Sequence, residues 1–129
     1  MEPARSSIRV LLADDDERYL ESLRALVEEQ PELSVVAEAA NGLDAIRAAD
    51  ETKIDAAVID LHMPVVDGVT TVAKLRRDHP SLCVIAITGD SEPHLLRAVE
   101  EAGADAVLLK EELVETLVER LRAATARLD

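Results

Sequence analysis

Short aliphatic runs alternate along the chain with longer segments in which apolar residues recur every three or four positions. The short runs are typical of strands buried on both faces, and the longer segments have the period of helices that bury one face. The predicted strands are Ile8–Ala13, Leu33–Ala37, Ile54–Asp60, Leu82–Thr88 and Ala106–Leu109. The predicted helices run from Tyr19 up to Pro31, over residues 43–51, from Val69 to His79-Pro80, from Pro93 to Ala102 and from Leu113 to Leu121.

Strict alternation of strand and helix with short connections predicts an α/β fold. Such units form a parallel sheet covered by helices on both faces, through right-handed crossovers. A chain of 129 residues has the length of one domain. We expect residues 1–129 to form a single domain, with no second domain among them.

Polar residues at the ends of the predicted helices act as local signals. Asp16 and Asp67 each precede a helix and are expected to cap it. Gly103 is expected to end the helix before it. His79, before a proline at a helix end, and His94, in a first helical turn, are expected to be exposed and structural.

The composition excludes several classes of function. A net charge of -13 argues against binding of DNA, RNA or an anionic membrane by this chain, because such binding is driven by Lys and Arg. No stretch approaches the length of a membrane span, and Cys83 is the single cysteine, so no internal disulfide is possible. We expect a reducing, cytoplasmic compartment and a buried Cys83. Tyr19 is the only aromatic residue, which leaves an aliphatic core.

Chemically active side chains stand where the predicted strands end. Asp14 and Asp15 follow the first strand, Asp60 ends the third, Thr88 the fourth, and Lys110 follows the fifth. The carboxyl ends of parallel strands share one edge of the sheet, where ligands of open α/β folds bind. We therefore expect these five residues to converge on one site.

Three neighbouring carboxylates require compensating positive charge if all are to stay ionised. Mg²⁺ prefers such oxygen ligands, and the absence of a Cys or His cluster at ligand spacing argues against zinc or copper. With the metal and Lys110 offsetting the repulsion between anions, Asp60 is a candidate nucleophile towards phosphorus, forming an aspartyl phosphate.

Four runs that contain these residues resemble a known family. In their order along the chain, Val10–Glu17, Val58–Gly68, Ile85–Gly89 and Gly103–Lys110 are similar to the receiver domain of bacterial two-component response regulators. Residues 39–42 and the Leu-Leu-Lys ending at Lys110 resemble most the subfamily that usually carries a C-terminal helix-turn-helix output domain. We expect no output domain within these 129 residues.

The resemblance implies a fold and a function. The implied fold is the flavodoxin-like (βα)5 three-layer sandwich, with a five-stranded sheet in the order 2-1-3-4-5, the order that general rules give for this family. The implied function is a signalling switch that accepts a phosphoryl group from a sensor histidine kinase with Mg²⁺, and that regulates transcription through an output domain or a partner. Such a domain takes part in its own phosphorylation and dephosphorylation but is not a turnover enzyme. A homodimer is possible in this family.

The resemblance also implies residue roles at the metal site. Asp60 matches the phosphoacceptor and Asp15 a direct Mg²⁺ ligand. Asp14 matches an acid that holds the metal mainly through water, and the backbone carbonyl of His62 matches a further ligand.

Other implied roles concern the phosphoryl group. The Thr88 hydroxyl matches the group that bonds it, and Lys110 the ammonium that pairs first with Asp60 and then with the phosphate. His62 and Asp90 occupy positions expected to set the lifetime of the phosphate. Val107 stands where the family has a switch aromatic, so the usual output mechanism is not expected in this chain.

Rival readings of the same architecture fail on particular residues. A cobalamin-binding motif that begins at Asp60 and His62 lacks its glycine at Val65, and the acidic loop at Asp14 would repel the phosphates of a flavin or dinucleotide. A phosphatase of the aspartyl-phosphate type usually has a second acid where His62 stands. The alternative that stays open is a pseudo-receiver, which keeps the fold as an unphosphorylated protein-interaction module.

Overall fold

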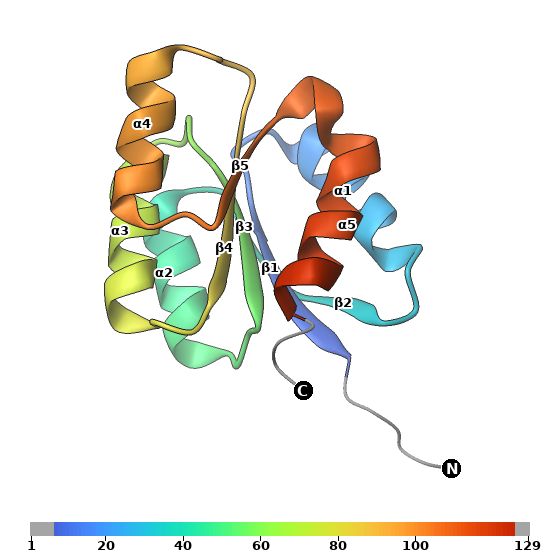
Figure 1. Cartoon of the computed structure of the whole chain (residues 1–129). Coiled ribbons are helices and arrows are strands. Elements are labelled where there is room, and N and C mark those ends of the chain that lie inside the picture. The colour runs from blue at the N-terminus through green and yellow to red at the C-terminus, as the bar shows by residue number, and fades with distance from the viewer. Residues whose placement is uncertain (1–6, 126–129) are drawn as a thin grey trace.

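The computed structural model describes residues 7–125, except for the side chains of residues 114, 115, 124 and 125. Strands and helices alternate throughout this part of the chain (Figure 1). The strands are β1 (Ile8–Ala13), β2 (Leu33–Ala39), β3 (Ala56–Asp60), β4 (Cys83–Thr88) and β5 (Ala106–Leu109). The helices are α1 (Glu17–Glu28), α2 (Gly42–Glu51), α3 (Gly68–Asp78), α4 (Pro93–Ala102) and α5 (Leu113–Thr125), with a short 3-10 turn, η1 (Lys110–Glu112), before α5.

The strands form one parallel sheet in the order β2-β1-β3-β4-β5. Figure 1 shows α2, α3 and α4 on one face of the sheet and α1 and α5 on the other. This is the predicted flavodoxin-like sandwich, in the predicted strand order.

Two apolar clusters, one on each face, hold the layers together. One joins the sheet to α1 and α5, and the other joins it to α2, α3 and α4. Every residue of β3 and β4 is buried, as expected for central strands covered on both sides. Leu113, Leu117 and Leu121 of α5 are buried in the first cluster, so this apolar face belongs to the core. The side chains of Val114 and Glu115 lie outside the described part.

Strand boundaries were predicted less well than strand positions. β2 runs two residues past Ala37, because residues 38 and 39 keep pairing with β1 although Glu38 is polar. β3 starts at Ala56 rather than Ile54, because Asp55 precedes the ladder and its carboxylate accepts a hydrogen bond from the Arg9 N–H at 2.9 Å. A polar side chain that bonds the backbone sets these ends more than apolar content does.

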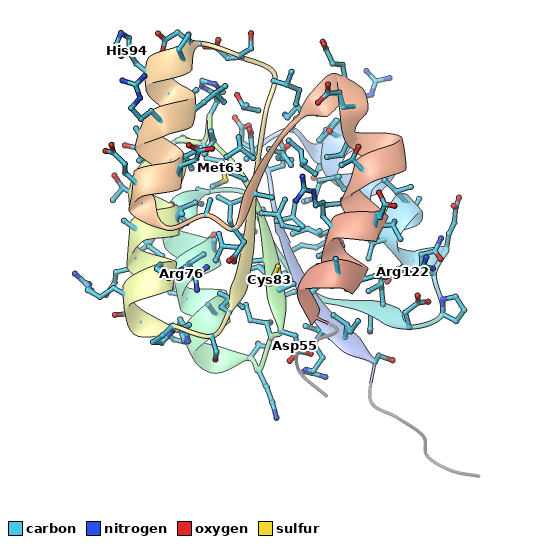
Figure 2. All side chains as sticks on the ribbon, in the orientation of Figure 1. Asp55, Met63, Arg76, Cys83, His94 and Arg122 are labelled. Carbon is cyan, nitrogen blue, oxygen red and sulfur yellow. The ribbon has the colours of Figure 1, made fainter. Side chains whose placement is uncertain are left out.

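The helix-end signals were mostly correct. The Asp16 carboxylate accepts hydrogen bonds from the first turn of α1, and the Asp67 carboxylate accepts one from the first turn of α3. Gly103 ends α4 with φ 113°, a conformation that favours glycine. His94 is exposed, as Figure 2 shows at the end of α4. His79 is partly buried rather than exposed, since its Nε2 lies 3.0 Å from Asp50 Oδ1.

Arg76 of α3 fixes the segment that leads into β5. Its guanidinium donates to the carbonyls of Pro80, Leu82 and Gly103 and to the Asp105 carboxylate at 2.7 Å. Figure 2 shows this side chain between α3 and the sheet, and Cys83 within the sheet, where it is buried as predicted. Helix α3 therefore sets where β5 begins, and with it the position of Lys110.

Gly68 begins α3 against the backbone that carries Asp60. A Cβ placed on Gly68 would lie 2.3 Å from Leu61 Cα and 2.6 Å from the Asp60 carbonyl oxygen. The Gly68 N–H also donates to the Leu61 carbonyl at 3.1 Å, which closes the loop between β3 and α3. Only glycine allows this approach.

We predict that Gly68→Ala lowers the free energy of unfolding by about 2 kcal/mol or more, because the added methyl collides with backbone that cannot move aside. Gly89→Ala is the matched control, since a Cβ on Gly89 meets nothing within 4 Å. It should change stability by less than about 0.5 kcal/mol. Equal losses in the two variants, measured by urea unfolding, would show that the close approach at Gly68 is not the cause.

Candidate functional site

Three carboxylates meet at the carboxyl-terminal edge of the sheet, as the sequence predicted. Asp14 and Asp60 are buried and Asp15 is exposed, and one oxygen from each lies within 4.8 Å of the others. Adjacent strands produce this approach, since Ala13 of β1 pairs with Ile59 of β3. Asp14, Asp15 and Asp60 are called the acidic cluster below.

Lys110 reaches into the acidic cluster from the end of β5. Its Nζ lies 3.1 Å from Asp14 Oδ2 and 3.7 Å from Asp60 Oδ1. The same Nζ lies 4.2 Å from the centre of the Tyr19 ring on α1. The sequence predicted the ion pairs but not the aromatic contact, because nothing in the spacing shows that α1 and the end of β5 meet.

Backbone groups hold the buried acids in place. Asp14 Oδ1 accepts a hydrogen bond from the Asp16 N–H at 2.8 Å, and Asp60 Oδ1 accepts one from the His62 N–H at 3.3 Å. Asp14 Oδ2 makes no hydrogen bond to the described residues, although the Lys110 ammonium lies near it. One buried carboxylate oxygen of the cluster is thus left without a directed donor.

The electrostatics of the acidic cluster act on Asp60. Burial raises the pKa of the Asp60 carboxyl above its ordinary value, and the negative charge of Asp14 raises it further. The His62 N–H and the Lys110 ammonium act in the opposite direction, and Asp15 adds a smaller increase in the pKa. Additional positive charge at this edge of the sheet would favour the ionised carboxylate.

Thr88 stands at the same edge, with its side chain fully buried. Its Oγ1 accepts a hydrogen bond from the Asp90 N–H at 3.0 Å and donates to the Asp90 carbonyl at 3.3 Å. The Asp90 carboxylate in turn accepts from the Glu92 N–H at 2.9 Å. Thr88 and Asp90 therefore connect the site to the loop that starts α4.

The loop between β3 and α3 forms another side of the site. His62 is exposed beside Asp60. The Val66 N–H donates to the Pro64 carbonyl at 2.8 Å, and Val65 between them has φ 71° and is 75% exposed. This is a strained γ-turn with a β-branched residue at its centre, a conformation that such residues rarely adopt.

Val107, at the position where the resemblance expects an aromatic side chain, lies in β5. It is partly buried against the apolar cluster that α2, α3 and α4 share. Tyr19 packs against the other cluster, under α1 and α5. The two residues therefore contact different faces of the sheet.

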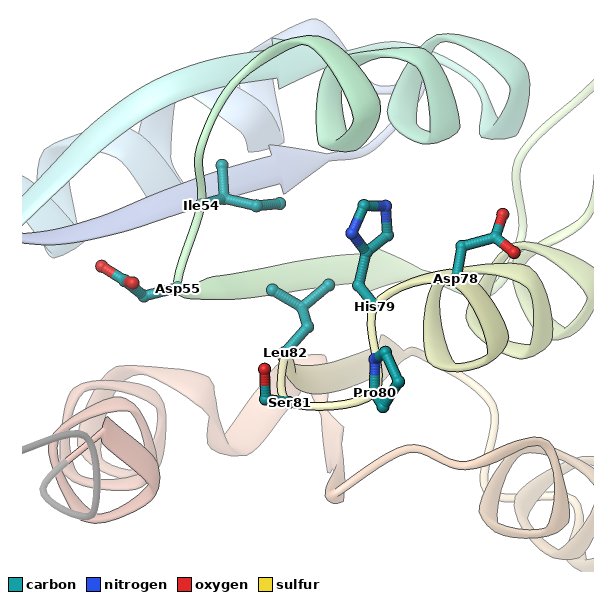
Figure 3. A pocket seen from close by; sticks show the side chains of 7 residues that line it. All are labelled: Ile54, Asp55, Asp78, His79, Pro80, Ser81 and Leu82. Carbon is teal, nitrogen blue, oxygen red and sulfur yellow. The ribbon is translucent and has the colours of Figure 1, made fainter.

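Two surface hollows differ in their relation to the acidic cluster. One, of about 410 Å³, is lined in part by Asp14, Asp15, Glu17 and Glu38 and adjoins the site. The other, of about 320 Å³, lies beside the starts of β3 and β4 and is lined in part by His79, Pro80 and Leu82 (Figure 3). The second hollow is at the opposite edge of the sheet, so only the first belongs to the site.

Among residues 7–125, no helix combines the length and the apolar content that crossing a membrane requires.

Known proteins share both the sequence and the fold. Residues 10–122 match the family of response regulator receiver domains. The nitrate/nitrite response regulator protein NarP of Escherichia coli is 36% identical over 121 residues, which cover 94% of this chain and 56% of that protein. The transcriptional regulatory protein PrrA of Mycobacterium leprae is 40% identical over 128 residues, or 98% of this chain and 54% of that protein.

A solved structure extends the likeness to the fold. The response regulator domain of Thermotoga maritima CheB superposes with a TM-score of 0.86 at 25% identity, covering 93% of this chain and 97% of that one. The chain spans about half the length of the curated relatives it matches. The convergence of the acids and Lys110, the strand order and these matches lead to one conclusion: the chain belongs to the response regulator receiver domain family of two-component systems.

Proposed function

We propose that this receiver domain is a phosphorylation-dependent switch in which Asp60 accepts the phosphoryl group. The observation that carries the proposal is the meeting of Asp60 with Asp14, Asp15 and Lys110 at one edge of the sheet. Asp60 is 2% exposed and yet carries a carboxylate beside other acids, an arrangement that costs stability and that packing alone does not require.

Receiver domains bind Mg²⁺ at an acidic pocket, and the residues of this chain fit that ion. The acidic cluster offers hard oxygen ligands, and the buried Asp14 Oδ2 has no hydrogen-bond donor among the described residues. We assign the metal to Asp14, Asp15, Asp60 and the backbone carbonyl of His62. When bound, Mg²⁺ supplies positive charge that offsets the repulsion between the carboxylates and the incoming phosphate.

The donor would be a phosphohistidine of a sensor histidine kinase. An Asp60 carboxylate oxygen attacks phosphorus, the P–N bond breaks, and its electron pair stays on the imidazole nitrogen. Lys110 stabilises the negative charge on the transferring oxygens. The Thr88 hydroxyl turns from the Asp90 backbone to the bound phosphoryl group.

The output follows from the same proposal. Regulation of transcription would pass through an output domain outside these residues or through a partner protein, and a homodimer is one form that the partner can take. The domain itself, with its charge of -13, binds neither nucleic acid nor membrane. We place it in the cytoplasm, where kinase and regulator meet, and we regard it as a regulator rather than a turnover enzyme.

The first prediction concerns the phosphoryl adduct. Incubation with a small phosphodonor such as acetyl phosphate and Mg²⁺ should add one phosphoryl group, read by intact mass. The adduct should be absent in Asp60→Asn and without Mg²⁺. Lys110→Ala should slow its formation by about tenfold or more, because a fixed positive charge is lost.

Glu101→Gln, an exposed change on α4, is the matched control and should react like the wild type. An adduct that persists in Asp60→Asn would place the acceptor elsewhere. No adduct under any condition would favour the pseudo-receiver.

A second prediction follows from the raised pKa of Asp60. A carboxyl whose pKa is higher in the folded state stabilises the fold at acidic pH, below its ordinary pKa, and that contribution is lost as the pH rises through the folded-state pKa. At pH 7 without Mg²⁺ the ionised Asp60 therefore destabilises the protein. Asp60→Asn should raise the free energy of unfolding there by about 1 kcal/mol or more, and the gain should shrink towards pH 4.

Urea unfolding at several pH values, with EDTA present, measures this difference. Mg²⁺ should stabilise the wild type more than Asp60→Asn, because a ligand that binds the folded state stabilises it by mass action. Loss of stability in Asp60→Asn at pH 7, or a gain that is independent of pH, would contradict the charge argument.

A third prediction concerns the lifetime of the phosphate. We propose that His62 and Asp90 admit or orient the attacking water. His62→Ala should change the dephosphorylation rate by about threefold or more. His94→Ala, an exposed histidine change on α4, should leave the rate unchanged.

Asp90 needs two variants because its carboxylate also accepts a hydrogen bond from the Glu92 N–H. Asp90→Asn keeps an acceptor for that bond and removes the charge, whereas Asp90→Ala removes both. Decay of the adduct is followed by intact mass after the donor is removed. Unchanged rates in the variants of both residues would refute these roles.

A further inference from the structure

Lys110 is held by three groups in this structure. Its ammonium contacts Asp14 Oδ2 at 3.1 Å, Asp60 Oδ1 at 3.7 Å and the face of the Tyr19 ring at 4.2 Å from the centroid. A cation over an aromatic face is attracted by the ring quadrupole, more strongly when it is partly desolvated. The Lys110 side chain is 27% exposed, so water only partly competes with this contact.

Hydrogen bonds tie Tyr19 to the acidic cluster. Asp14 Oδ1 accepts from the Asp16 N–H at 2.8 Å, and Asp16 Oδ1 accepts from the Tyr19 N–H at 3.3 Å. With the contact of Lys110 on Asp14 Oδ2, these bonds close a circuit from Asp14 through Asp16 and Tyr19 to Lys110 and back. The helix cap that starts α1 therefore also sets the position of the ring under the ammonium.

The ring, rather than the hydroxyl, carries the contact. The Tyr19 hydroxyl oxygen is buried and has no hydrogen-bond partner among the described residues. Burial, followed by the charges of Asp14 and Asp60, raises the pKa of Tyr19 to about 12, so the phenol stays neutral. A phenylalanine ring would offer the same face, which makes Tyr19→Phe a conservative variant.

No other residue of this chain can supply an aromatic contact. Tyr19 is the only aromatic residue of the sequence, and Val107 is aliphatic and packs on the other face of the sheet. We propose that Tyr19 is a positioning residue for Lys110: its ring and Asp14 hold the ammonium beside Asp60 for phosphoryl transfer, and phosphorylation draws the ammonium off the ring. This inference rests on the proposed function of Asp60.

The kinetic test compares formation of the adduct from acetyl phosphate and Mg²⁺ in four full-length proteins: wild type, Tyr19→Phe, Tyr19→Leu and Leu26→Ala. Tyr19→Leu keeps an apolar side chain but loses the ring, and should slow the reaction about three- to tenfold, as expected for a lost cation–π contact. Tyr19→Phe should react at the wild-type rate. Leu26, also on α1, packs against the same apolar cluster, and its variant should lose stability but not rate.

A double-mutant cycle separates positioning from packing. In a Lys110→Ala background, Tyr19→Leu should have no further effect on the rate, because the group that the ring holds is gone. Equal rates for Tyr19→Leu and wild type would overturn the proposal, as would the same fold loss in both backgrounds. Absence of any adduct in the wild type would instead overturn the function of Asp60, and this proposal with it.

The fluorescence of the single tyrosine gives a second readout. Phosphorylation of the wild type should change the emission of Tyr19 as the ammonium leaves the ring, and Asp60→Asn should show no such change with donor and Mg²⁺. An adduct complete by intact mass with unaltered tyrosine emission would contradict the movement of Lys110 from the ring.

Discussion

Mutual repulsion of three carboxylates at the end of an apolar sheet is the constraint that shapes this molecule. Two unit charges about 5 Å apart repel by roughly 3 kcal/mol at an effective dielectric constant of about 20. The register that pairs Ala13 with Ile59 brings Asp14 beside Asp60, and a slip of one residue would turn the strand's apolar side chains to the wrong faces. The two apolar clusters thus hold together charges that would otherwise separate.

The same constraint explains the local design around the acids. Each buried carboxylate accepts a backbone N–H from the residue two positions ahead, Asp16 for Asp14 and His62 for Asp60. Gly68 keeps the following helix close to the Asp60 peptide, and Arg76 fixes the segment from which Lys110 emerges. Donors and the one ammonium compensate part of the negative charge, and the buried oxygen of Asp14 that lacks a donor marks the part left for a metal ion.

Much of the fold could be predicted from the sequence because burial on both faces leaves an unmistakable record in β3 and β4. The convergence of Asp14, Asp60 and Lys110 followed, since parallel strands end at one edge. The limits of β2 and β3 were missed because they depend on pairing with β1 and on the Asp55 carboxylate. The strand order came from the family resemblance, and the contact of Tyr19 with Lys110 needs that order together with side-chain geometry.

The edge that carries the acids leads to the two faces of the sheet by different residues. Thr88 hydrogen-bonds Asp90, whose carboxylate receives the Glu92 N–H at the start of α4. Lys110 lies over Tyr19, which packs into the cluster under α1 and α5. With Val107 unable to offer a ring on the α4 face, the aromatic contact of this domain lies on the α1 face. An event at Asp60 that moves Lys110 therefore acts first on α1, whereas one that moves Thr88 acts first on α4.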